Sequence, residues 1–374
     1  MEVDFNLEHV PPPPPKKDYR IGAIGAGFIM RDIHLVAYRN AGYNVVAITS
    51  KPPEQAREVA QARGVPKAYD STEELLADAS IEVIDIAVPP DQQLAVVRQV
   101  VRHPDHIKGI LAQKPLGRNY PEACQVVRLC KGAGITLAVN QNMRYDQSIR
   151  ALKTLLNRGY LGEPVLATIE MRATPHWKPW VQDLGRLTLL VMSIHHLDSF
   201  RYLFGDPESV YCSARTDPRT RFPHRDGVVL YTLEYASGLR AAAWDDVWAG
   251  PAREGAAADT YIKWRVEGTH GMARGTIGWP SYPNLTPSTI DFTTRLQPGC
   301  WFSPRWKEAW FPNAFEGTMG QLLEALHSGA EPAISGRDNL KTMALVEACY
   351  KSIDEHRPVN LSEIRFLSQK CNCG

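Results

Sequence analysis

The sequence predicts an α/β protein with a doubly wound parallel sheet in its N-terminal part and an α+β domain with a large, mostly antiparallel open sheet in its C-terminal part. Three observations support this. A short apolar strand ends in the turn Gly25-Ala26-Gly27 and runs into a helix. Apolar strand-like segments then alternate with helix-like segments up to about residue 139. All nine tryptophans come later, among alternating stretches typical of antiparallel strands.

These changes in pattern divide the chain into four segments. We expect a proline-rich arm over residues 1–18, a dinucleotide-binding Rossmann domain over 19–141, a substrate-binding and oligomerisation domain over 142–360, and a tail over 361–374. The last helix could also pack back on the dinucleotide-binding domain. The five prolines at 11–15 favour a stiff polyproline II segment, which we interpret as part of a disordered leader. The alternative is an arm laid across a cofactor cleft or a neighbouring subunit.

The elements of the N-terminal part follow from local signals. Strands are expected over residues 21–24, 45–49, 83–88, 107–112 and 135–139, with helices between them. Gly42 and Gly64 stand where helix ends favour a left-handed residue. Ser71 followed by Glu74 predicts a capping box, and Asp91 is expected to cap the next helix. Strands that are apolar throughout suit a sheet covered on both faces.

The sequence of the C-terminal part predicts one broad sheet with a few helices. We expect helices over residues 148–157, 186–204, about 314–328 and 339–356, and strands over 164–173, 210–215, 228–235, 239–247, 261–267 and 272–276. Residues 236–238 predict a hairpin turn. Helices on one face of such a sheet leave the other face bare, so we expect a homodimer or homotetramer formed through this sheet.

Composition excludes several classes of partner. The 42 basic and 41 acidic residues give no electrostatic footprint for nucleic acid or an anionic membrane, so a small molecule is the expected partner. No run is long enough to span a bilayer. Seven scattered cysteines suggest reduced thiols and a cytoplasmic protein. Cys371 and Cys373 have no nearby histidine pair, so we expect no metal.

The glycine turn is the expected seat of a cofactor pyrophosphate. A helix that starts directly after a strand exposes backbone N–H groups at the positive end of its dipole. Gly25 permits the tight turn, and Gly27 lets the backbone approach the phosphates. Met30 stands where a third small residue would allow close packing of helix and strand, so the match is incomplete.

The end of the second strand bears on the form of the cofactor. An Asp or Glu there usually binds a free ribose 2′-hydroxyl, but no carboxylate occurs before Glu54. The Ser50 hydroxyl and the Lys51 ammonium, with Arg57, could hold a 2′-phosphate, which favours NADP over NAD. The alternative is that Lys51 is a solvated loop charge and that Ser50 accepts either cofactor.

A lysine follows the strand at residues 107–112. Pro115 restricts Lys114, which should point into the crevice at the carboxyl ends of the strands. Its ammonium could stabilise the alkoxide that forms as hydride leaves a substrate carbon, and desolvation beside a nicotinamide would lower its pKa. The expected cofactor-binding residues are Gly25, Gly27, Phe28, Ile29, Ser50, Lys51, Pro89, Gln93, Gln113, Lys114 and Asn142.

Three motifs together carry a family resemblance. They are Ile24-Gly25-Ala26-Gly27-Phe28-Ile29, Gln113-Lys114-Pro115-Leu116 and Ile194-His195-His196-Leu197-Asp198. In this order the chain resembles the glucose–fructose oxidoreductase and inositol dehydrogenase family (Gfo/Idh/MocA) over residues 20–358. The resemblance implies a nicotinamide-binding domain coupled to an open-sheet domain, with Lys114 and His195 as catalytic residues.

The chain departs from that family at three positions. Gln113 replaces a Glu, Val191 replaces an Asp of the catalytic triad, and Gln93 stands where members tend to carry His. Asp198, three residues after His195 on the same helix face, could compensate for Val191 by orienting the imidazole.

A polar and aromatic loop follows the strand at residues 164–173. Its indole faces could receive a polyol, while neighbouring side chains bind hydroxyl or carboxylate groups. The expected substrate-binding residues are Lys114, Arg172, His176, Trp177, His195 and His196. For any single tryptophan of this loop we favour packing at the sheet edge, and for His196 a structural or supporting role.

These readings predict an NAD(P)-dependent oxidoreductase that transfers hydride between nicotinamide and a secondary alcohol or ketone of a sugar, sugar acid or cyclitol. One alternative is an oxidoisomerase on the same scaffold that retains its cofactor. The other is a non-catalytic NAD(P)-binding regulator, because Val191 weakens the triad.

Overall fold

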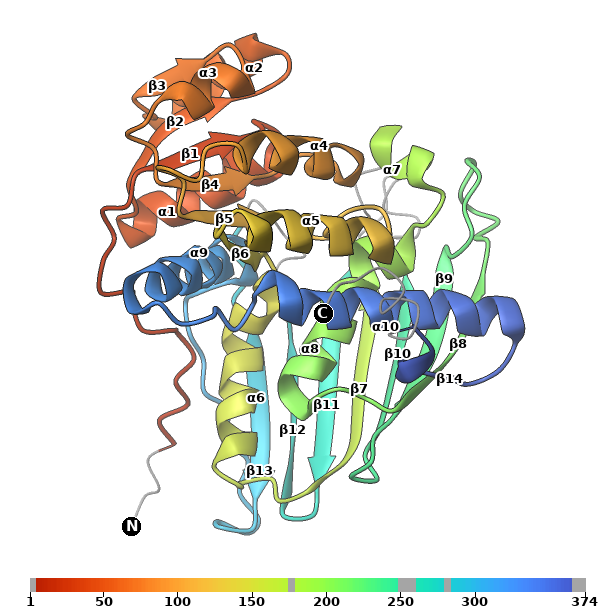
Figure 1. Ribbon diagram of the computed structural model, residues 1–374. Helices are drawn as coiled ribbons and strands as arrows, with labels where there is room; N and C mark the ends of the chain where they lie inside the picture. Colours follow the sequence, from red (N-terminus) through yellow and green to blue (C-terminus); the bar gives the residue numbers. More distant parts are fainter. Residues whose placement is uncertain (1–4, 174–178, 248–259, 279–283, 365–374) are drawn as a thin grey trace. The chain divides into compact units, whose positions relative to one another are not determined.

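The computed structural model describes residues 5–173, 179–247, 260–278 and 284–364 (Figure 1). The chain divides into two compact units. The parallel-sheet unit contains Pro12–Asn142 and Pro312–Met343. Within the described residues, the antiparallel-sheet unit contains the arm up to Pro11, Met143–Phe311 and residues 344–364.

In the described chain, the parallel-sheet unit is built on a six-stranded sheet, as its fold class predicts. The strands are β1 (Ile21–Ile24), β2 (Val45–Thr49), β3 (Lys67–Tyr69), β4 (Val83–Ile86), β5 (Gly109–Ala112) and β6 (Thr136–Val139). Their order is β3-β2-β1-β4-β5-β6, and all neighbours are parallel. The order reverses between β1 and β4, which is where doubly wound sheets bind ligands.

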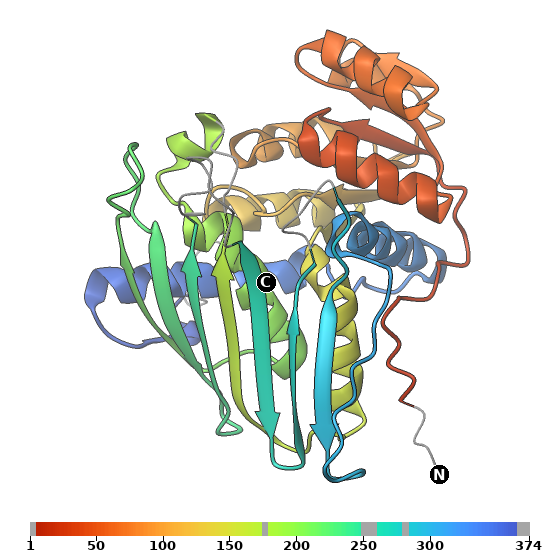
Figure 2. The ribbon, with the colours of Figure 1, turned by 180° about the vertical axis from the view of Figure 1, so that it is seen from behind.

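Helices cover both faces of this sheet. They are η1 (Ile29–His34, a π-helix), α1 (Leu35–Ala41), α2 (Pro53–Arg63), α3 (Thr72–Ala77), α4 (Pro90–Val100), α5 (Tyr120–Gly132), most of α9 (Trp310–Ser328) and the start of α10 (Gly336–Glu355). Figures 1 and 2 show α4 and α5 on one face and α1 and α9 on the other. Helix α9 packs so closely on β5 that a Cβ on Gly109 would lie 3.0 Å from Leu326.

The helix ends test the predicted caps. Gly42 and Gly64 end their helices with φ of +74° and +72°, as predicted. The Ser71 hydroxyl accepts the Glu74 N–H at 3.1 Å, which confirms that cap. The prediction for Asp91 is wrong: α4 begins at Pro90, whose fixed φ and missing N–H suit the first helical position, so Asp91 lies inside the first turn.

The antiparallel-sheet unit is built, in its described part, on an eight-stranded sheet. The strands are β7 (Pro164–Arg172), β8 (Ser209–Arg215), β9 (Val228–Glu234), β10 (Arg240–Asp246), β11 (Tyr261–Gly268), β12 (Gly271–Thr276), β13 (Thr289–Thr294) and β14 (Val359–Asn360). Their order is β13-β12-β11-β7-β10-β9-β8-β14, and only the β7–β10 pair among them is parallel. The predicted hairpin joins β9 to β10, with Gly238 at φ +90°.

The helical segments of this unit are η2 (Asn142–Tyr145), α6 (Gln147–Asn157), α7 (Pro179–Leu184), η3 (Leu189–Ser193, a π-helix), α8 (Ile194–Phe204) and the end of α10. Helices α6 and α8 lie on one face of its sheet (Figure 1). Figure 1 shows α6 and α8 in front of the sheet, and Figure 2 shows the opposite face. Strand residues alternate between buried and exposed, and large apolar side chains such as Leu230 and Tyr211 are 55% and 43% exposed.

The helix predicted over residues 186–204 starts later, at Leu189. The buried carboxylate of Asp226 accepts the backbone N–H groups of Leu187 and Leu189 at 2.7 and 2.8 Å. Its Oδ2 also accepts the hydroxyl of Tyr350 at 2.8 Å. The cap therefore comes from a residue distant in sequence, which local signals could not reveal.

The prediction of a disordered leader is wrong for the described arm residues. The ring of Phe5 lies 5.2, 5.0 and 4.7 Å from those of Tyr160, Phe292 and Phe302. Leu7 is 5% exposed. Aromatic partners on the antiparallel-sheet unit hold this segment, which composition alone did not indicate.

Two further expectations concern membrane-spanning helices and the state of the cysteines. Within the described residues, none of the helices combines the length and the hydropathy needed to cross a bilayer. The described cysteines, Cys124, Cys130, Cys212, Cys300 and Cys349, are free thiols. Cys371 and Cys373 lie outside the described residues.

Candidate active site

The glycine turn after β1 needs its first glycine for steric reasons. Gly25 has φ +102°, and a Cβ there would lie 2.5 Å from the carbonyl oxygen of Ala87. The Gly25 N–H donates to the Thr49 carbonyl at 2.8 Å. The turn is therefore fixed at the carboxyl end of β1, against the chain that leaves β4.

The second glycine has a different function. A Cβ on Gly27 would meet no atom within 4 Å, so the space in front of this backbone is open. The half-buried Phe28 and Ile29 follow as the helix begins. Open space before a helix N-terminus suits the pyrophosphate of a dinucleotide, because bare N–H groups can approach it closely. These residues fit such a cofactor.

Met30 does not obstruct this turn. The side chain is fully buried among Ala23, Ala26, Ile48 and Ala56, whose small or slender side chains leave room for it. The helix also begins as a π-helix, which widens its first turns. The departure from the glycine fingerprint is thus absorbed by packing.

The end of β2 presents the residues expected near the cofactor ribose. The buried Ser50 hydroxyl donates to Gln55 Oε1 at 3.3 Å, and Lys51 is exposed. Arg57 pairs with Glu54 at 2.9 Å and with Asp70. Because two carboxylates neutralise Arg57, Lys51 is the better candidate for a phosphate contact.

The loop after β5 holds Lys114 between two side-chain contacts. Gln113 Oε1 accepts the backbone N–H of Lys114 at 2.9 Å, and Gln93 Nε2 donates to the carbonyl of Pro115 at 3.0 Å. Gln93 is fully buried, and Pro89 is the residue before α4. The side chain of Lys114 is partly exposed, yet desolvation lowers its pKa to about 7. A pKa near neutrality is typical of a lysine in an active site.

A buried histidine lies behind this loop. His34 Nδ1 is 2.7 Å from Asp85 Oδ2, and its Nε2 is 2.9 Å from Asn140 Nδ2 and 3.2 Å from Gln113 Nε2. All of these residues are less than 10% exposed. His34 and Asp85 were not predicted from the sequence, although a carboxylate within the apolar strand β4 needs a buried partner and indicates that one exists.

The histidine pair lies at the start of α8. His195 is 4% exposed, and its ring meets that of Trp310 edge-on at 5.4 Å. His196 is fully buried, and its Nδ1 lies 2.9 Å from Oδ1 of Asp245. The other carboxylate oxygen of Asp245 accepts the Ser193 hydroxyl. The π-helix η3 directly precedes this pair, and such segments are frequent at functional sites.

Asp198 forms a buried ion pair that the sequence analysis did not identify. Its carboxylate accepts from Arg144 Nε and Nη2 at 2.6 and 2.7 Å. Arg201 Nη1 lies 3.7 Å from the same carboxylate. The pair ties α8 to η2, while its predicted action on His195 stays a prediction.

The remaining predicted residues are distributed as follows. Arg172, at the end of β7, pairs with Asp246 on the adjacent β10 at 3.4 Å. Asn142 is buried, and its Nδ2 donates to the carbonyl of Asn140 at 3.3 Å. His176 and Trp177 lie outside the described residues.

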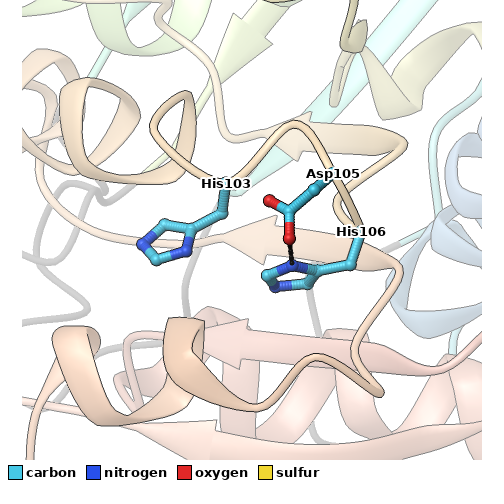
Figure 3. Close-up of side chains that lie close together, drawn as sticks. All are labelled: His103, Asp105 and His106. Atoms are coloured by element: carbon cyan, nitrogen blue, oxygen red, sulfur yellow. Dashed lines mark hydrogen bonds and ion pairs between the residues drawn. The ribbon is translucent and has the colours of Figure 1, made fainter.

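One group of three possible metal ligands occurs among the described residues (Figure 3). Atoms of His103, Asp105 and His106 lie within 4.8 Å of one another, whereas a tetrahedral zinc site needs about 3.3 Å between ligand atoms. His106 already bonds to Asp105 at 3.2 Å and to the Leu76 carbonyl at 3.1 Å. We assign this partly exposed group no metal function.

The strand order, the glycine turn and the reversal between β1 and β4 define a dinucleotide-binding α/β protein. Residues 19–141 match the model described as "Oxidoreductase family, NAD-binding Rossmann fold", and residues 149–274 match the "GFO/IDH/MocA C-terminal domain". These matches together span more than half of the chain, so the protein belongs to the GFO/IDH/MocA oxidoreductase family.

Named relatives match along nearly the whole chain. D-apiose dehydrogenase of Paraburkholderia graminis is 28% identical over 354 residues, covering 93% of this chain and 91% of that protein. Inositol 2-dehydrogenase of Rhizobium meliloti is 27% identical over 350 residues, covering 92% and 99%. A solved oxidoreductase from Agrobacterium radiobacter, in complex with NAD+, L-tartaric acid and magnesium, shares the fold with a TM-score of 0.77 and 23% identity, covering 93% of this chain and 99% of that chain.

Proposed function

We propose that this protein is an NAD(P)-dependent dehydrogenase that transfers hydride between nicotinamide and a secondary alcohol or ketone of a sugar, sugar acid or cyclitol. The observation that carries the proposal is Lys114, which follows a parallel strand near the ligand-binding edge and has a pKa of about 7. The names of relatives, D-apiose dehydrogenase and inositol 2-dehydrogenase, support the substrate class.

The bound nicotinamide supplies hydride acceptance and donation. In the oxidation direction, His195 takes the proton of the substrate hydroxyl, and the Lys114 ammonium stabilises the developing alkoxide. In reduction, Lys114 polarises the carbonyl and His195 returns the proton. Asp198, held by Arg144, acts as a positioning residue by fixing the helix that carries His195. Arg172, His176, Trp177 and His196 complete the proposed substrate site.

The proposal is tested by following the absorbance of reduced cofactor over a panel of sugars, sugar acids and cyclitols. Lys114→Met and His195→Gln should each lower kcat/KM by about 100- to 10,000-fold. Lys131→Met, on the exposed surface of α5, is the matched control and should leave it unchanged. Cofactor binding without turnover on any substrate would instead favour a regulator, and turnover only with a second sugar as acceptor would favour an oxidoisomerase.

We propose NADP as the preferred cofactor, because the end of β2 offers Ser50 and Lys51 in place of a carboxylate. Lys51→Ala should raise the Kd for NADP about tenfold and leave that for NAD within about twofold, since only NADP carries the extra phosphate. Titration calorimetry with both cofactors measures this. An equal effect on both cofactors contradicts the assignment.

We propose further that the open face of the antiparallel sheet joins copies of the chain into a homodimer or homotetramer. The exposed Leu230 and Tyr211 support this, because large apolar side chains gathered on one face favour burial. Leu230→Glu should shift the mass measured by light scattering toward the monomer. Exposed Leu296 is the control, and Leu296→Glu should leave the mass unchanged. A monomeric wild-type protein overturns this proposal.

A further inference from the structure

His34 is enclosed within the parallel-sheet unit. Its ring is fully buried, lies 5.1 Å from that of Phe315, and contacts polar groups from three neighbouring strands or their ends. Asp85 lies in β4, Gln113 directly follows β5, and Asn140 directly follows β6. A buried imidazole must have a partner for each ring nitrogen, so these contacts determine where its proton resides.

The orientation of Gln113 fixes the tautomer of His34. Gln113 Oε1 accepts the Lys114 N–H at 2.9 Å, so the carboxamide NH₂ is the group that faces His34 Nε2 at 3.2 Å. The nitrogen that accepts these hydrogens must carry a lone pair. The ring proton of a neutral His34 therefore lies on Nδ1 and is donated to Asp85 at 2.7 Å.

Two other contacts agree with this arrangement. The NH₂ group of Asn140 also faces Nε2, at 2.9 Å, while its Oδ1 lies 3.4 Å from Asn142 Nδ2, a donor. The Tyr38 hydroxyl donates to the same carboxylate oxygen of Asp85 at 2.8 Å. Asp85 thus binds Nδ1 of the His34 ring, and the amide groups of Gln113 and Asn140 donate to Nε2.

This network ends at the candidate catalytic lysine. The chain of contacts runs from Asp85 through His34 and Gln113 to the backbone N–H of Lys114. On the other side of the loop, Gln93 holds the carbonyl of Pro115. Both neighbours of Lys114 are therefore tied to buried groups, which limits the positions available to its backbone.

We propose that His34, held in the Nδ1–H tautomer by Asp85, is a positioning residue that fixes the Lys114 loop through Gln113. The inference rests on the proposed function of Lys114 and adds a residue to it. It also gives a physical reason for Gln113: a carboxylate there would face the lone pair of Nε2 and would force His34 to bind a second proton.

The tautomer is tested by nitrogen NMR of protein labelled with ¹⁵N-histidine, with the His34 signals assigned by their loss in His34→Phe. The wild-type protein should show a protonated Nδ1 and an unprotonated Nε2 near neutral pH. Gln113→Glu should convert Nε2 to the protonated form. A wild-type ring with a protonated Nε2, or a ring unchanged by Gln113→Glu, overturns the inference.

The positioning is tested by hydrogen exchange and kinetics. His34→Phe should speed exchange of the Lys114 amide and lower kcat by about 10- to 100-fold, while the KM for cofactor stays within about threefold. Tyr350→Phe is the control, because it also removes a hydrogen bond to a buried carboxylate, that of Asp226, but lies outside this network. Equal exchange and equal kcat in the two variants would overturn the inference.

The readouts separate failure of this inference from failure of the proposed function. If the wild-type protein turns over no substrate, the dehydrogenase proposal fails, while the tautomer and the exchange of the Lys114 amide still decide whether His34 fixes the loop. If His34→Phe does not fold, Gln113→Leu removes the same link to the Lys114 N–H and supplies the exchange and kinetic readouts, while the difference between the wild type and Gln113→Glu identifies the His34 signals.

Discussion

Replacing Lys114 with methionine should stabilise the protein at neutral and acidic pH, and the gain should disappear as the pH rises. Burial lowers the pKa of Lys114 from 10.5 to about 7. Below pH 7 the amine is charged in both the folded and the unfolded chain, so folding bears the full cost of desolvating an ammonium. Between pH 7 and 10.5 only the unfolded chain binds the proton, so the wild type gains stability with pH, and above 10.5 the cost is gone.

The size of the effect follows from the shift. A pKa lowered from 10.5 to about 7 corresponds to at most about 5 kcal/mol, because one unit is about 1.4 kcal/mol. Lys114 retains some exposure, and solvent screening reduces the expected difference to about 2–3 kcal/mol at low pH. Within the window the difference between the two proteins should fall by up to about 1.4 kcal/mol per pH unit.

The measurement is urea unfolding of the wild type and Lys114→Met at about pH 6, 8 and 10. Other lysines and tyrosines titrate in both proteins, so their contributions cancel in the difference. Lys131→Met, which removes a lysine from the exposed surface of α5, serves as the control for the loss of one amine. A difference for Lys114→Met that is independent of pH, or a wild type that is the more stable protein at pH 6, would refute the reasoning.

Four other predictions concern single residues. Gly25→Ala should cost about 2–3 kcal/mol of unfolding free energy, because its Cβ would meet the Ala87 carbonyl at a φ of +102°. Gly27→Ala should fold normally but bind cofactor at least about tenfold more weakly, and equal stability losses in both glycine variants would contradict this. Asp226→Asn should cost about 1–3 kcal/mol by urea unfolding, against about 0.5 or less for the exposed Asp354→Asn, since only Asp226 accepts three buried donors. Phe5→Ala should cost about 1–2 kcal/mol and speed proteolysis of the arm, whereas unchanged cleavage would show that its aromatic partners do not hold it.

Much of the fold could be predicted from local patterns in the sequence. The predicted bounds of β1 and β2 coincide with the observed strands, because short apolar runs between a glycine turn and helices leave few alternatives. β3 was missed because it is only three residues long and includes an exposed lysine, Lys67. The Ser71 cap was predictable because both partners lie within one helical turn.

Long-range polar contacts limited the prediction of the site. Lys114 could be identified because it follows a strand and precedes a proline. The hydrogen bond from Gln93 to the Pro115 carbonyl, and the link from Gln113 to His34, depend on residues far away in sequence. The pairing of Asp198 with Arg144 likewise joins residues 54 positions apart. A charged residue within an apolar stretch of sequence indicates that it has a buried partner. Which residue that partner is depends on the tertiary fold.

The composition of the parallel-sheet unit has a consequence for synthesis of the protein. Its sheet is complete at β6, yet the unit also includes Pro312–Met343, and α9 from this later segment packs on β5. The Val139 N–H further donates to the carbonyl of Ile334 at 2.8 Å. During synthesis, the part of this sheet face that α9 covers therefore stays exposed until the segment Pro312–Met343 has left the ribosome.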